Sequence, residues 1–178
     1  MPWIAQVESE SGGVLARLVV HHHQYVLDGG RTASMETCVA WCDDCRRFTV
    51  AEDLKTPQAL ERQEAQATAR YLELRQAPAG DMAPDMQAEM VRRVVEAMHG
   101  RYDLLRQVME KRESPARCLE CGGTRFQRVE RDVVEWVDHP QGNGRVRVVI
   151  SGQAQVSEPP LRYSVEGVRL DPPAPATP

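Results

Sequence analysis

The sequence has no long apolar run and few aromatic residues. Nowhere do eighteen apolar residues follow one another, and the first residues do not combine a basic start with an apolar segment. We therefore expect neither a membrane span nor a secretion signal. Lysine is scarce, because only Lys55 and Lys111 occur and the rest of the fixed positive charge is arginine. The formal net charge of -4 argues against a protein dominated by nonspecific phosphate binding.

The common catalytic and nucleotide-binding motifs are also missing from the sequence. It contains no glycine-rich phosphate loop, no Ser-His-Asp constellation and no paired-carboxylate motif. Its five cysteines are an odd number, which without a secretion signal predicts free or metal-bound thiols in a reducing compartment, the cytoplasm. These absences favour a protein that is not an enzyme.

Four of the cysteines form two Cys-x-x-Cys pairs, Cys42 with Cys45 and Cys118 with Cys121. Two residues between paired cysteines let a tight turn aim both sulfurs at one point, and four thiolates complete the tetrahedral shell of Zn²⁺. Two local disulfides or a redox pair are the alternatives. The spacing favours one zinc ion per chain, and because four thiolates leave no open coordination position, this zinc is expected to be structural.

The segments Trp41–Phe48 and Arg117–Gly123 resemble the knuckle pair of a zinc ribbon, also called rubredoxin-like. Gly122–Gly123 fits the small residue that this family needs after the second cysteine, whereas Arg46–Arg47 departs from it at the first knuckle. The resemblance implies that all four paired cysteines are metal ligands. It implies no particular function, because zinc ribbons bind nucleic acids, dock proteins or only support a fold.

Periodicity predicts β-structure on both sides of a helical segment. Alternation predicts strands from Trp3 to Val7 and from Val14 to Leu27, joined as a hairpin, and another through residues 36–50. Thr56-Pro57 predicts a helix over about 57–77, and Pro84 begins a second one that Pro115 stops. The second helix carries an apolar seam at alternating spacings of four and three, comprising Val91, Val95, Met98, Tyr102, Leu105 and Met109.

Beyond the second knuckle the sequence returns to β-structure. Residues 125–138 and 145–156 are strand-like and joined by a turn at 139–144, with Val146, Val148 and Ile150 facing inward. A last strand is expected at 162–170. We therefore predict an α+β fold. Residues 1–55 and 116–170 form an antiparallel β body tied by a Cys₄ zinc ribbon, residues 56–115 form an inserted αα-hairpin that projects from it, and 171–178 form a disordered tail.

Arginines beside the knuckles are candidates for contact with nucleic acid or a partner protein. Next to Trp41 and Phe48 they could grip phosphates and stack bases. Alternatively, nearby acids neutralise them in a salt-bridged surface. The candidate residues are Arg46, Arg47, Arg117, Arg125 and Arg128, and the acids are Asp43, Asp44, Glu120 and Glu130.

Two further features concern histidine and the fifth cysteine. His21 and His23 are two residues apart, so on a strand they would share a face and could bind a second metal with Asp28 or His139. The alternative is a strand that carries no metal. Cys38 precedes the first knuckle and is expected to be buried as a small hydrophobe.

The functional prediction is a non-enzymatic adaptor that holds structural zinc. Its helical hairpin or β surface would dock another protein or a second copy of the chain. The alternative is a nucleic-acid-binding module that uses the arginines beside the zinc. Net acidity and few aromatic residues favour the adaptor.

Overall fold

The computed structural model describes residues 2–76, 83–129, 135–154 and 159–171. The chain divides into two compact units, the first comprising Met1–Leu54 and Arg112–Pro178 and the second comprising Lys55–Lys111. Residues 77–82 of the hairpin connection and most of the predicted tail lie outside the described residues.

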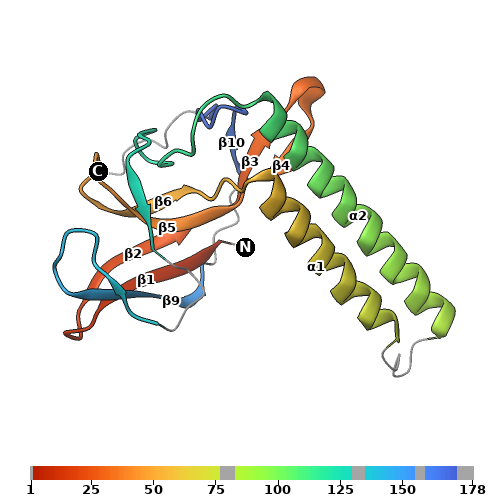
Figure 1. Ribbon diagram of the computed structural model, residues 1–178, viewed down its shortest axis with the longest axis horizontal. Helices are drawn as coiled ribbons and strands as arrows, with labels where there is room; N and C mark the ends of the chain where they lie inside the picture. Colours follow the sequence, from red (N-terminus) through yellow and green to blue (C-terminus); the bar gives the residue numbers. More distant parts are fainter. Residues whose placement is uncertain (1, 77–82, 130–134, 155–158, 172–178) are drawn as a thin grey trace. The chain divides into compact units, whose positions relative to one another are not determined.

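The first unit contains three sheets, which Figure 1 shows in colours that follow the sequence. One is fully antiparallel, with the order β2-β1-β9-β8. Its strands are β1 (Trp3–Ser9), β2 (Val14–Val20), β8 (Val137–Asp138) and β9 (Arg145–Gln153). The other sheets have the orders β10-β3-β4 and β6-β5-β7. Their strands are β3 (His23–Val26), β4 (Thr32–Ser34), β5 (Thr37–Cys42), β6 (Arg47–Glu52), β7 (Phe126–Arg128) and β10 (Leu161–Tyr163), and a short 3₁₀ helix, η1 (Asp28–Gly30), joins β3 to β4.

The predicted α+β class with mostly antiparallel sheets is confirmed. One described pair departs from it, because β10 lies parallel to β3. The apolar core of the first unit joins the sheet of β1, β2 and β9 to the sheet of β5 and β6. Its buried members are Ala5, Val7, Val20, Val39, Trp41, Phe48, Val129, Val146 and Val148.

Three details of the predicted strands are wrong. The strand expected from Val14 to Leu27 is broken, because β2 ends at Val20 and β3 begins at His23. The strand expected over 162–170 ends at Tyr163, where the chain turns back through Gly167 at a φ of 70°. Ile150 was expected inside and is 55% exposed. It follows the part of β9 that β8 covers, so only β1 flanks it.

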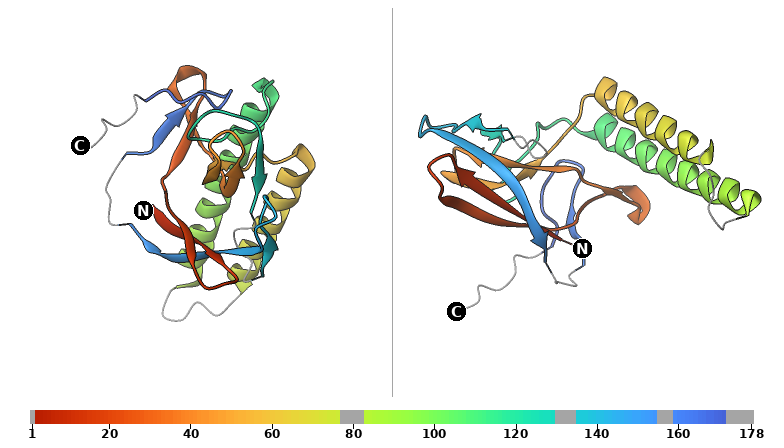
Figure 2. Two further views of the ribbon diagram at one scale, coloured as in Figure 1. Left: turned by 90° about the vertical axis from the view of Figure 1, so that its left-hand side faces the viewer. Right: turned by 90° about the horizontal axis from the view of Figure 1, so that it is seen from below.

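The second unit is a pair of antiparallel helices, α1 (Pro57–Gln76) and α2 (Pro84–Lys111). They lie side by side in all views of Figures 1 and 2. The Oγ1 of Thr56 accepts a hydrogen bond from the Ala59 amide at 3.2 Å, which caps the start of α1. Between the helices, the Glu64 carboxylate binds the His99 ring at 2.6 Å and the Arg106 guanidinium.

The apolar seam of α2 differs slightly from the predicted one. Val91, Tyr102 and Leu105 are buried as expected, but the buried residue of the last turns is Val108, at 1% exposure, while Met109 is half-buried. A spacing of three from Leu105 continues the buried stripe where we expected four. Residues three and four positions after Leu105 lie on neighbouring parts of the same helix face, so periodicity alone does not choose between Val108 and Met109.

Candidate metal centre

Four cysteine thiols meet at one point of the first unit. Cys42 ends β5 and Cys45 lies in the turn before β6, while Cys118 is bridged to Ala51 of β6. The sulfurs of all four paired cysteines lie within 4.8 Å of one another. The close contact of the two pairs was predicted from their spacing, and the structure brings all four together.

The sulfur separations fit a tetrahedral metal ion. Sγ of Cys42 lies 3.7 Å from Sγ of Cys121, and Sγ of Cys45 lies 3.9 Å from Sγ of Cys118. A tetrahedral Zn²⁺ with bonds of about 2.3 Å places its sulfurs about 3.8 Å apart. A disulfide would need about 2.05 Å, and none of the five cysteines is in a disulfide. The donor set therefore fits a zinc ion.

The two knuckles have matching backbone turns. Arg46 follows the second cysteine of the first knuckle at a φ of 53°, and Gly122 follows that of the second knuckle at 73°. Both residues at this position of the knuckle adopt the left-handed conformation, although Arg46 is not a glycine. Gly123 has a different environment, because a Cβ there would meet the exposed Asp44 carboxylate, which would have to shift.

The pKa values of three of the thiols are shifted, and that of Cys118 is lowered, because its hydrogen bonds outweigh the effect of its burial. Burial and the neighbouring thiols raise the pKa of Cys45 well above its usual range, and burial also raises the pKa of Cys42. Backbone amides already approach two sulfurs, Cys45 N to Cys42 Sγ at 3.5 Å and Gly123 N to Cys121 Sγ at 3.4 Å. A divalent cation would supply the positive charge that four thiolates need.

Cys38 is not part of this group. It is 3% exposed and packs with Ala40 and Ala51 in a small apolar cluster. It therefore lies where a small hydrophobe was expected.

Most of the candidate arginines have partners among the described residues. Arg47 binds the Glu120 carboxylate and Arg125 binds that of Asp44. The remaining bonds are Arg128 to Asp53 at 2.8 Å and Arg117 to the carbonyl oxygens of Glu166 and Gly122 at 2.8 and 3.0 Å. Arg46 is exposed and has no ion pair with a described residue. The salt-bridged surface therefore describes this region better than an open basic patch, although Glu130 lies outside the described residues.

The histidines do not form a second ligand group with the residues considered for it. His21 lies between β2 and β3, whereas His23 is buried and its ring packs against Tyr163 at 5.6 Å. His139 packs instead against Trp41, at 5.1 Å. Within the described ranges, the four cysteines are the one group of three or more histidine, cysteine or acidic side chains placed to share a metal.

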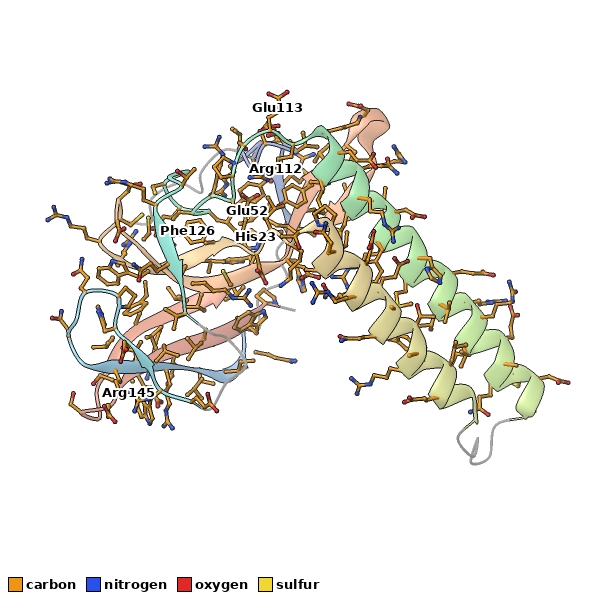
Figure 3. All side chains as sticks on the ribbon, in the orientation of Figure 1. His23, Glu52, Arg112, Glu113, Phe126 and Arg145 are labelled. Atoms are coloured by element: carbon orange, nitrogen blue, oxygen red, sulfur yellow. The ribbon has the colours of Figure 1, made fainter. Side chains whose placement is uncertain are left out.

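A buried ion pair escaped the sequence analysis. The guanidinium of Arg112, 2% exposed, binds the fully buried carboxylate of Glu52 at 2.6 Å. Tyr25 donates its hydroxyl hydrogen to the same carboxylate at 2.9 Å, and the Arg117 amide donates at 2.7 Å. Figure 3 shows Glu52 and Arg112 together. No local motif joins these residues, so only their charges, at the two ends of the helical insertion, could have suggested the pair.

Comparisons with protein-family models, curated proteins and solved structures give no match to this chain. Among the described residues, no helix combines the length and the hydrophobicity needed to cross a membrane.

Proposed function

We propose that this chain is a non-enzymatic adaptor of a reducing compartment, the cytoplasm, which holds one structural Zn²⁺ and binds another protein. Its zinc ligands would be Cys42, Cys45, Cys118 and Cys121. The observation that carries the proposal is the sulfur geometry, because the separations fit a ZnS₄ tetrahedron and leave no position for a substrate. Zinc would then stabilise the fold without taking part in a reaction.

The pairing of the knuckle arginines favours a protein partner over nucleic acid. Neutralised guanidinium groups release few counterions when they meet phosphates, so they contribute little to nucleic-acid affinity. Arg47, Arg125 and Arg128 each have a carboxylate partner. A nucleic-acid-binding zinc ribbon remains the alternative, with Arg46 as an exposed knuckle arginine that forms no ion pair with a described residue.

The helical hairpin supplies the surface that supports docking. A groove of about 430 Å³ on the hairpin has Leu72, Val91 and Val95 in its apolar lining, and Leu72 is 46% exposed. Glu89 and Arg92, which bind each other, lie at the same groove. An apolar groove with a polar rim is the anatomy of a protein interface. A partner or a second copy of the chain would cover this groove.

Binding experiments separate the two functions. Fluorescence anisotropy with single- and double-stranded oligonucleotides should show only weak binding at physiological salt. Tight, salt-sensitive binding that is lost when Arg46, Arg47 and Arg125 become alanine, with zinc retained, would reverse the choice.

The docking surface is tested with a charge in the groove. Leu72→Glu should abolish capture of the partner, or self-association in sedimentation, because it puts a charge on the apolar lining. Ala69→Glu adds the same charge at another exposed position of α1 and should have no effect. Leu105 of the same helical unit is unsuitable for this test, because it is buried and its replacement would disturb the hairpin itself. Equal loss in both variants would contradict the proposed surface.

A further inference from the structure

A pocket of the first unit lies beside the second knuckle. It has a volume of about 570 Å³ and is lined by parts of β2, β6, the second knuckle and the β10 turn. This volume is in the range of pockets that hold small molecules. Apolar side chains make up much of its wall, including Val50 and Leu161, and none of the functions above uses it.

Two arginines bring positive charge to one part of this pocket. Arg117 and Arg169 both line it, and neither forms an ion pair with a described residue. The acid of the wall, Glu120, is already bound by Arg47. Asp171, outside the pocket, interacts electrostatically with Arg169. Its carboxylate accepts hydrogen bonds from the Arg162 amide at 2.6 Å and from the Arg162 guanidinium.

The wall also contains a polar atom without a partner. His23 is 7% exposed, and its Nδ1 is buried with no hydrogen-bond partner. A buried polar atom left unpaired destabilises the folded protein. A ligand oxygen would be a suitable partner for an N–H there.

We propose that this pocket binds a small organic anion that has an apolar part. Its carboxylate or phosphate would lie near Arg169 and His23, and its apolar part would lie on Val50 and Leu161. A zinc tetrathiolate carries two net negative charges, so the anion would avoid the wall made by Cys118. The proposal is independent of the adaptor function and of any docking on the helical hairpin.

The test is a titration of the zinc-loaded, full-length protein followed by amide chemical shifts in ¹H–¹⁵N spectra. The probes are phenyl phosphate, benzoate and the neutral benzyl alcohol. We expect saturable shifts at Leu119, Tyr163 and Val168 with one or both anions, and none that saturate with the alcohol. The two anions distinguish a phosphate ligand from a carboxylate ligand.

Variants at arginine give the matched control. Arg169→Gln should weaken binding at least tenfold, and Arg169→Lys should recover part of it. Arg145→Gln makes the same change far from His23 (Figure 3) and should leave binding unchanged. Absence of saturation with both anions would overturn the proposal, and so would equal binding of the alcohol. Unchanged binding with loss of zinc in Arg169→Gln would assign that arginine to charge balance of the thiolates instead.

Discussion

At the scale of single residues, both knuckles contain a left-handed backbone position beside the cysteines. The position after the second cysteine is left-handed in both knuckles, and it is occupied once by Gly122 and once by Arg46. An L-residue pays about 1–2 kcal/mol for this conformation, whereas glycine does not. The first knuckle therefore tolerates a strain that the second avoids.

Replacing Arg46 with glycine should stabilise the protein. The variant loses the left-handed strain, which stabilises the folded state. Its unfolded chain gains conformational entropy, which destabilises the folded state by about 0.4–1 kcal/mol, so the free energy of unfolding should rise by about 0.5–1 kcal/mol. Gly122→Ala should lose about 1 kcal/mol for the opposite reason. Urea unfolding of the zinc-loaded variants measures both changes. A less stable Arg46→Gly protein would mean that the arginine side chain contributes more than its backbone costs.

His23 should make stability depend on pH. Burial, helped by the charge of His21, lowers the pKa of His23 to about 4, whereas an exposed or unfolded histidine titrates near 6.5. Between these values the unfolded chain binds the proton first. The contribution of His23 is therefore complete above about pH 6.5 and falls by up to about 3 kcal/mol as the pH drops to 4.

Comparing variants with the parent protein separates the contribution of His23 from the loss of stability that follows protonation of the thiolates. In His23→Gln, the free energy of unfolding should fall less between pH 6.5 and 4 than in the parent protein. His22→Gln, at an exposed neighbour, should retain the parent slope. Parallel curves for all three proteins would show that His23 accepts protons as readily when folded as when unfolded.

At the scale of secondary-structure elements, local signals predicted the helices better than the strands. Thr56, Pro57 and Pro84 begin the helices where the sequence placed them, because capping and proline geometry act over a few residues. Strand ends depend on which neighbours pair. The break after Val20 and the exposure of Ile150 follow from β3, β8 and β9 pairings that no local pattern contains.

The Glu52–Arg112 pair holds the segments on either side of the helical insertion together. Arg112 also donates to the carbonyl oxygens of Ser114, Pro115 and Val165. These hydrogen bonds satisfy the polar groups of the buried pair. The stability of each buried charge therefore depends on the presence of its partner.

Removing one partner of the buried pair should be costly. Arg112→Met should destabilise the protein by about 3–5 kcal/mol, because it leaves the Glu52 carboxylate buried without a counter-charge. The double change of Glu52→Gln with Arg112→Met should cost less than the sum of the single changes. Arg47→Met, which breaks the exposed pair with Glu120, should cost less than about 1 kcal/mol. Chemical unfolding checks all four proteins, and strictly additive costs would show that the pair does not act as a unit.

At the scale of the whole molecule, the cluster of four cysteines was predictable and its surroundings were not. Cys-x-x-Cys spacing identifies its members because each pair is set by one local turn. The pocket beside the second knuckle and the Glu52–Arg112 pair combine residues from several distant segments, and only the fold brings them together. The neutralised arginine surface lies between these cases, since the acids were visible in the sequence but their pairings were not.

Folding of the first unit should require zinc, whereas folding of the helical hairpin should depend on zinc less. Apparent binding energies of structural zinc, about 10–16 kcal/mol, exceed the stability of most domains, so chelation should unfold the β-sheets. Cys42 directly follows the core residue Trp41, so tryptophan fluorescence should report this loss. Helices of the second unit pack mainly on each other, so the circular dichroism signal at 222 nm should fall less. Cys118→Ser should behave like the chelated protein, and Cys38→Ser should behave like the parent. Dispersed amide spectra after complete zinc removal would contradict this prediction, because they would show that the first unit folds with its thiols alone.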